Sequence, residues 1–168
     1  FLEGFYNKPR VDIELLKKYN EGLICMSACI SGEVARLLNN NEYENAKKTV
    51  ELYSSIFGRD NYFIEIQNHG INEEIKIINS LYRLSMETGV GLVATNDAHY
   101  ILKEDYKMQH VLMCIQTNAK VNDPNSMHFS TNEFYMKSYD EMFELFKNRE
   151  EALSNTVKIA QRCNVEFE

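Results

Sequence analysis

Three short apolar runs, separated by segments with helical periodicity, constrain the fold of this chain more than any other feature. The runs occupy residues 23–26, 62–66 and 91–95, and turn-forming residues bound each of them. Strands that alternate with helices are typical of a mainly parallel sheet with helices packed outside it. Because three strands are too few to close a barrel, the sequence predicts an α/β fold whose buried strands form an arc of one.

Helical periodicity places helices between these strands and after the last one. Asp12 is expected to cap a short helix that reaches Tyr19, and Asn72 to cap a helix that Gly89 closes. Further elements are predicted at about 33–38, 42–57, 104–115, 139–146 and 150–163 as helices and at 134–136 as a short strand. The apolar residues expected on one side of the helix at 104–115 are Met108, Val111, Leu112 and Ile115.

Composition limits the class of protein. The 168 residues include 18 basic and 25 acidic side chains, a net charge of −7, which argues against a free-standing nucleic-acid binder because phosphate neutralisation supplies much of such a protein's affinity. No apolar run approaches the ~18 residues that span a bilayer. Four cysteines without an export signal indicate cytoplasmic thiols rather than disulfides. The start at Phe1 rather than Met indicates a piece of a longer protein.

Polar residues follow each of the three predicted strands. They are the segments 27–29, 67–70 and 95–100, with Glu65 inside the second strand. In parallel α/β folds, functional groups gather beyond the carboxyl ends of the strands. We therefore expect any chemistry of this chain to lie at that edge of the sheet.

Asp97 and His99 are the strongest metal-binding candidates among these residues. Two residues apart on an extended chain, their side chains would point the same way and converge on one zinc or manganese ion. The alternative is a capping aspartate beside a histidine that forms local hydrogen bonds. Cys29 by itself is more typical of a small core residue. Glu65 and His69 either act as ligand and proton shuttle or brace the loop through hydrogen bonds, and bracing is favoured.

Many segments of the chain, in order, carry a resemblance to a known family. They lie at 4–12, 22–24, 27–33, 62–70, 92–100, 114–117, 123–124, 133–138, 155–156, 159–160 and 162–165. With these segments the chain resembles the polymerase and histidinol phosphatase (PHP) domain of bacterial replicative DNA polymerase III alpha subunits. The resemblance implies a distorted seven-stranded α/β barrel with metal ions held at its carboxyl-end mouth.

Carried over by position, the resemblance implies that Cys29 is a metal ligand and that Asp97 and His99 are the final ligand pair. It places three further residues near the site or bracing it: Glu65, His69 and Asn96. The metal in a complete PHP domain would be zinc, manganese or magnesium, and this chain alone is expected to bind it weakly or not at all. No catalytic residue is expected in the isolated chain.

Two departures from the family pattern bear on this reading. Ala28 stands where the family commonly has glycine between serine and cysteine. The early His-x-His motif is absent, because the histidines stand at positions 69, 99, 110 and 128. We therefore expect residues 1–168 to be a single-domain fragment, the later part of a PHP domain. Its closing helices, at about 139–163, would lead toward a polymerase palm outside the chain.

The function implied by the resemblance is that of a DNA-directed DNA polymerase in chromosome replication, in the cytoplasm. The PHP module would resemble a metal-dependent phosphoesterase or 3′–5′ exonuclease. The partners implied are the remainder of the polymerase chain, replisome subunits that include a proofreading exonuclease, and DNA held by the rest of the parent protein. A stand-alone PHP phosphoesterase and a non-catalytic scaffold that docks a proofreading exonuclease are the alternatives. An open sheet edge is expected to favour self-association.

Overall fold

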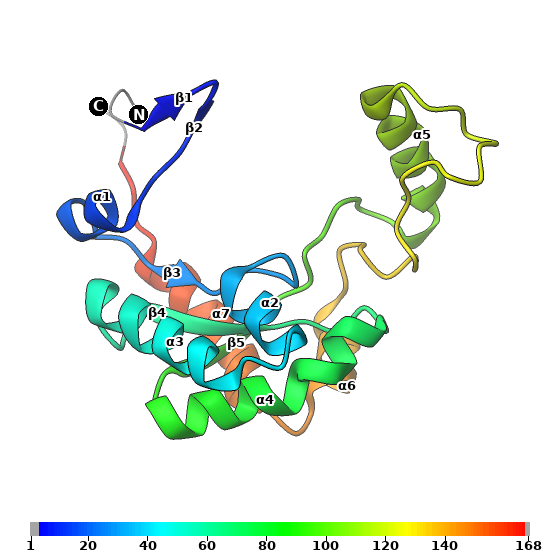
Figure 1. The fold of residues 1–168 in the computed structure, drawn as a ribbon. Helices are drawn as coiled ribbons and strands as arrows, with labels where there is room; N and C mark the ends of the chain where they lie inside the picture. The colour runs from blue at the N-terminus through cyan, green and yellow to red at the C-terminus, as the bar shows by residue number, and fades with distance from the viewer. Residues whose placement is uncertain (1–3, 167–168) are drawn as a thin grey trace.

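The computed structural model describes residues 4–166 and contains five strands and eight helical segments within them (Figure 1). The strands are β1 (Phe5–Tyr6), β2 (Lys8–Pro9), β3 (Cys25–Met26), β4 (Tyr62–Ile66) and β5 (Gly91–Ala94). The helical segments are α1 (Ile13–Lys18), α2 (Glu33–Asn39), α3 (Tyr43–Phe57), α4 (Asn72–Thr88), η1 (Lys103–Asp105), α5 (Tyr106–Thr117), α6 (Tyr139–Phe146) and α7 (Glu150–Arg162).

The central sheet confirms the predicted α/β class. Its three strands are parallel and lie in the order β3-β4-β5, with Cys25 opposite Tyr62 and Phe63 opposite Gly91. The sheet does not close on itself, as expected for an arc of a barrel. The strands β1 and β2 form a separate antiparallel pair near the amino terminus.

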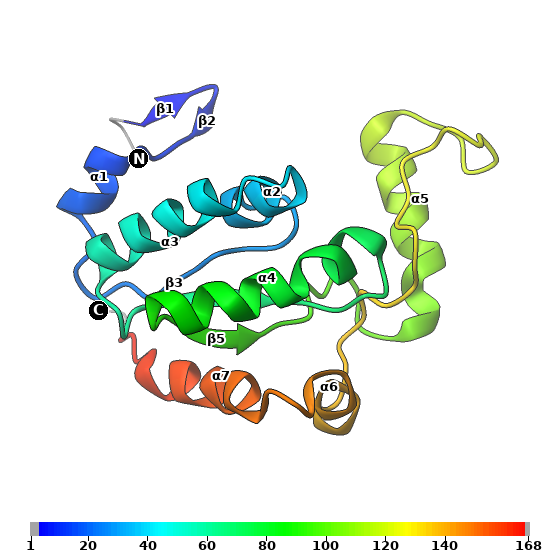
Figure 2. The ribbon, with the colours of Figure 1, turned by 60° about the horizontal axis from the view of Figure 1, so that its bottom comes forward.

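Helices cover the sheet and form one apolar core with it. Figure 2 shows α3 and α4 on one side of the sheet and α7 on the other. α2 packs against both α3 and α4, while α7 packs along β5. The fully buried side chains at the centre of the core include Val50, Tyr62, Ile64, Ile66 and Leu84.

Several helix ends follow from their sequences. The Asp12 side chain accepts a hydrogen bond from the Leu15 N–H at 2.9 Å, as predicted for a capping residue. Gly89 ends α4 in the left-handed conformation, with φ of +69°. The prediction for Asn72 is wrong, because Ile71 occupies the N-cap position and Asn72 is the first residue of the helix.

The first predicted strand is shorter and more exposed than expected. Only Cys25 and Met26 form β3, and Leu23 and Met26 are exposed rather than buried. The reason is its position, because β3 pairs with β4 on one side and is the outer strand of the sheet within residues 4–166. Burial of its side chains would need a further neighbour.

Residues 101–132 form an arm that stands away from the sheet in both views (Figures 1 and 2). The arm contains the 3-10 turn η1, the helix α5 and the loop that follows it. A single predicted helix at 104–115 is therefore a turn followed by a helix. The predicted strand at 134–136 is reduced to one bridge, between Tyr100 and Tyr135. Across residues 4–166, no helix combines the length and apolar character needed to cross a membrane.

Leu84 and Met86 on α4 offer a matched test of the core. The Leu84 side chain is 0% exposed and the Met86 side chain is 78% exposed. Replacing Leu84 by Ala should lower the free energy of unfolding by about 2–5 kcal/mol, because it removes buried methyl groups and leaves a cavity. Met86→Ala should change it by less than about 0.5 kcal/mol. Urea denaturation checks both values, and equal effects would contradict this core.

Candidate functional site

The polar residues that follow β3, β4 and β5 lie together at one edge of the sheet, as the sequence predicts. The Glu65 N–H donates to Ser27 Oγ at 2.8 Å and joins the ends of β3 and β4. Gln67 Nε2 donates to Thr95 Oγ1 at 2.9 Å and joins β4 to the segment after β5. The Glu65 carboxylate accepts hydrogen bonds from both Thr95 and Gln67. Glu65 therefore braces the ends of three strands.

His69 is the most completely bonded side chain at this edge. It is 1% exposed, and its ring stacks on Phe134 with 4.0 Å between ring centroids. Nδ1 lies 2.6 Å from Glu74 Oε1, and Nε2 lies 2.7 Å from the Asn96 carbonyl oxygen. Because a carbonyl can only accept, Nε2 carries a proton, and a further proton lies between Nδ1 and the Glu74 carboxylate. Both ring nitrogens are thus engaged within the protein.

Glu74 completes this arrangement from the first turn of α4. Its other oxygen, Oε2, accepts the His69 backbone N–H at 2.6 Å. The two side chains are almost wholly buried, so their charges and donors are paired with one another rather than with water. The sequence analysis did not single out Glu74. Its role could have been predicted from its position five residues after His69, at the start of a predicted helix, where the helix dipole favours a carboxylate.

Asn96 links the end of β5 to the segment before α6. Its amide donates to the Tyr135 carbonyl oxygen, and its Oδ1 accepts from Lys137 Nζ at 3.1 Å. The Lys137 ammonium also pairs with the Glu133 carboxylate at 3.3 Å. Burial lowers the pKa of Lys137, and the carboxylate of Glu133 opposes that shift. Lys137 is a second residue that could not be singled out from the sequence, since its contact with Asn96 joins positions 41 residues apart.

Asp97 does not lie on extended backbone. It has φ of +42°, in the left-handed region, so the chain turns there. The expectation of extended geometry at Asp97 is therefore wrong, and the convergence of the two side chains on one metal ion stays a prediction. The His99 Nδ1–H instead donates to the Asp97 carbonyl oxygen at 2.6 Å, and the ring packs against Phe129 and Phe134. This local hydrogen bond is compatible with both readings of His99, because a metal-ligating histidine commonly donates its other ring N–H to a backbone carbonyl.

Cys29 follows β3 at the same edge of the sheet. It lines a small cavity of about 20 Å³, together with Glu65, Gln67 and Glu74, whereas neither Asp97 nor His99 lines it. The residue before it, Ala28, has φ of +65°, a conformation that glycine adopts without steric cost. Ala28 therefore occupies, at some strain, a position whose backbone suits the glycine that the family commonly has there.

These residues do not form a ready metal site. Across residues 4–166, no three side chains of His, Cys, Asp or Glu are grouped so that they could hold one metal ion. Sulfur, carboxylate and imidazole are suitable donors for zinc, but the structure does not bring Cys29, Asp97 and His99 into one group. The ligand roles of the three residues therefore stay a prediction.

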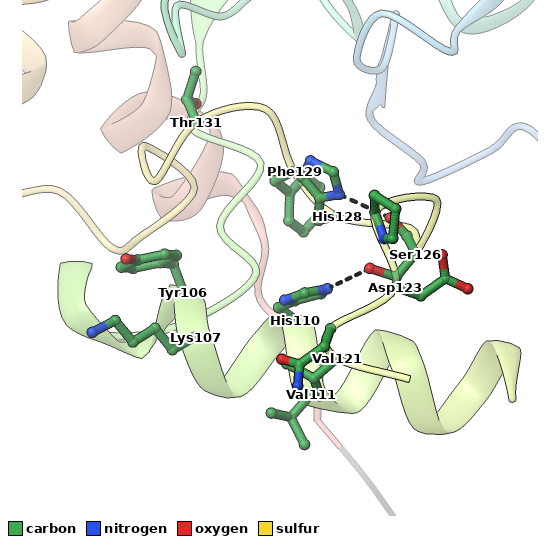
Figure 3. Close-up of a pocket in the computed structure, with 12 residues that line it drawn as sticks. Tyr106, Lys107, His110, Val111, Val121, Asp123, Ser126, His128, Phe129 and Thr131 are labelled. Carbon is green, nitrogen blue, oxygen red and sulfur yellow. Dashed lines mark hydrogen bonds between the residues drawn. The ribbon is translucent and has the colours of Figure 1, made fainter. Parts of the chain in front are cut away.

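The arm holds a pocket of its own, of about 470 Å³, between α5 and the loop that follows it (Figure 3). His110 Nε2 lies 2.9 Å from Ser126 Oγ. His128 Nδ1 donates to the Ser126 carbonyl oxygen at 2.8 Å, because a carbonyl oxygen can only accept. Ser126 itself is buried. The His110 side chain thus fastens the loop to α5, while the hydrogen bond of His128 lies within the loop.

Ser138 begins α6 with a capping box. Its hydroxyl accepts from the Glu141 N–H, and the Glu141 carboxylate accepts from the Ser138 N–H at 2.7 Å. The Tyr135 hydroxyl also donates to Glu141. The hydrogen bond from Tyr135, followed by those from Ser138, lowers the pKa of Glu141 to about 2. The same contact with Glu141, followed by burial, raises the pKa of Tyr135 to about 12.

The chain matches a known family over the region that contains β3 and β4. The PHP domain family model matches residues 1–69, a range that includes Cys29, Glu65 and His69. Together with the open parallel sheet and its polar carboxyl-end edge, this match indicates a fragment of a PHP-type domain. Almost the whole chain is also similar to bacterial DNA polymerase III alpha subunits.

Three relatives show how far the similarity extends. The chain is 47% identical to the DNA polymerase III subunit alpha of Treponema pallidum and 47% identical to that of Borreliella burgdorferi, over 98% of its length in each case. It is 40% identical to the subunit of Thermus aquaticus over 99% of its length. The matched region spans 14% of each of these three relatives.

The buried pair of His69 and Glu74 can be tested with an adjacent control. Glu74→Ala should lower the free energy of unfolding by about 3–5 kcal/mol, because it leaves buried donors of His69 without an acceptor. Glu73→Ala, at an exposed position one residue earlier, should cost no more than about 1 kcal/mol. Urea denaturation measures both variants. Should Glu74→Ala not fold, Glu74→Gln keeps one acceptor oxygen and should fall between the two; equal losses for all variants would contradict the pairing.

The Glu141 contacts predict an acid-dependent share of stability. A carboxyl pKa of about 2 in the folded chain lies below its ordinary value of 4.5, so the contribution is complete above pH 4.5 and is lost as the pH falls toward 2. Glu141→Gln should therefore be less stable than the natural chain at pH 6, and the difference should shrink toward zero near pH 2. Urea midpoints across this range check it, with Glu144→Gln as the control on the same helix. A difference that does not change with pH would contradict the contact.

Proposed function

We propose that this chain is a segment of a replicative DNA polymerase III alpha subunit and acts in DNA-templated DNA synthesis as part of that longer polypeptide. The single observation that carries the proposal is the similarity of 98–99% of the chain to alpha subunits of which it spans 14%. A match at this identity, continuous along the chain, supports a common role and not only a common fold.

Within such a parent, nucleotide addition would proceed by two-metal phosphoryl transfer at carboxylates outside these 168 residues. DNA would likewise be held by other regions, in keeping with the net charge of −7 on this segment. The partners in this proposal are the remainder of the polymerase chain and the replisome subunits, which include a proofreading exonuclease, in the cytoplasm. The isolated chain is expected to have little or no catalytic activity.

The proposal for the PHP module itself is metal-dependent phosphoester hydrolysis or 3′–5′ exonuclease activity in a complete domain. Cys29, Asp97 and His99 would then contribute ligands for zinc, manganese or magnesium, with Asn96 next to the Asp-x-His pair. Support comes from the family match and from the donor chemistry of the three side chains. Their use as ligands would require further ligands from beyond this segment and a rearrangement around Asp97.

A structural role is the second candidate for this segment. The observation that favours it is the bonding of His69, whose two ring nitrogens and backbone N–H all have partners within the protein. Such a residue stabilises the carboxyl-end edge of the sheet and is not free to move protons. The segment would then support its neighbours in the polymerase, as a scaffold that docks a proofreading exonuclease would.

The size of the native protein tests the proposed function. An antibody raised against the 168-residue chain should detect, in an immunoblot of the source cells, a protein several times heavier than 19.6 kDa. That result is expected because the matched relatives are about seven times as long as the match. A band only modestly heavier than the chain would leave no room for a polymerase palm. It would overturn the proposal in favour of a stand-alone PHP phosphoesterase.

A further inference from the structure

The helix α5 has two unlike faces. The face toward the following loop includes His110 and the buried Cys114, and the half-buried Val111 lies at its border. On the opposite side, one helical turn apart from one another, lie Met108, Leu112 and Ile115. These three side chains are 63%, 57% and 72% exposed, although all are large and apolar. We refer to Met108, Leu112 and Ile115 as the α5 stripe.

The spacing of the α5 stripe is that of a helix that lies in an apolar groove. Positions i, i+4 and i+7 form one continuous row along a helix, and such rows anchor helices in grooves of other structures. The arm stands away from the sheet in both ribbon views (Figures 1 and 2), and the exposure of the three side chains shows that the core of this segment does not cover the stripe. A contiguous exposed row of this kind marks a contact surface.

Charge and area favour an occupant within the same polypeptide. The arm has three lysines and three acidic residues, so neither DNA nor a charged partner is favoured by its electrostatics. A stable interface between separate chains buries roughly 800 Å² on each partner, which is more than three side chains of one helix supply. Contact within one polypeptide does not lose the translational freedom that association of separate chains costs.

We propose that the α5 stripe packs into an apolar surface elsewhere in the same polymerase polypeptide, outside these 168 residues. The proposal rests on the proposed function, since it requires a longer parent chain. The matched region spans only 14% of the relatives, which leaves most of such a parent available to supply the surface. The arm then acts as a tether between the sheet of this segment and another part of the polymerase.

Oxidation of Met108 by dilute hydrogen peroxide measures the coverage of the stripe without any substitution. The 168-residue chain and the purified parent polypeptide are each mixed with a fully exposed methionine peptide as the internal reference, and sulfoxide is quantified by peptide mass spectrometry. In the 168-residue chain, Met108 should oxidise at a rate close to that of the reference. In the parent alone it should oxidise at least about fivefold more slowly, because a packed thioether is shielded from the oxidant.

Each other outcome overturns the inference in a recognisable way. Fast oxidation of Met108 in a parent of full polymerase size would show that the stripe is uncovered, while the proposed function would stand. Protection only after replisome subunits are added would assign the stripe to a separate protein. Protection in the 168-residue chain that rises with its concentration would assign it to a second copy. A native protein close to 19.6 kDa would instead remove the proposed function itself.

Discussion

The carboxyl-end edge of this sheet depends on one buried imidazole. His69 receives its partners from three places: Glu74 at the start of α4, the Asn96 carbonyl after β5, and Phe134 before α6. Its own carbonyl accepts the Thr131 hydroxyl at 3.1 Å, which adds the end of the arm. Burial of a polar group without a hydrogen-bond partner lowers the stability of the folded chain. These segments are therefore held in the arrangement that gives both ring nitrogens of His69 a hydrogen-bond partner.

Asn96 extends the same network to the segment between the arm and α6. Its side chain contacts Tyr135 and Lys137, while its backbone carbonyl serves His69. The backbone of Asn96 is therefore held from two directions, immediately before the turn at Asp97. The rigid part of this edge is the bracing network, and the groups proposed as metal ligands lie beside it.

The sequence was most informative where local chemistry decides the outcome. The strand at 62–66 has the predicted bounds, because its residues alternate between buried and half-buried positions. The helix at 139–146 also has the predicted bounds, and the capping box of Ser138 defines its start. The predicted burial of Leu23 and Met26 was wrong, because burial depends on a neighbouring strand and not on the run itself. An amphipathic pattern likewise predicted α5 but not that its apolar side would face solvent.

The candidate site was less predictable for the same physical reason. The polar residues could be assigned to one edge, since parallel strands end together. The left-handed turn at Asp97 could not be read from an Asp-x-His pair, because aspartate adopts that conformation only where its surroundings require it. The partners of His69 and Lys137 include residues 27, 41 and 62 positions away, and side-chain spacing carries no information about such contacts.

The two outer strands of the sheet differ in what they offer to a further strand. On β5, the backbone of Leu92 faces away from β4, and its carbonyl oxygen already accepts a hydrogen bond from Asn155 Nδ2 of α7 at 2.8 Å. On β3, the amides of Cys25 and Ser27 donate toward β4, so the backbone of Met26 faces outward. Because an outward-facing strand backbone is a template for pairing, the sheet can be extended beside β3 more readily than beside β5. The sheet therefore has one edge whose backbone is open to a further strand and one edge that α7 already engages.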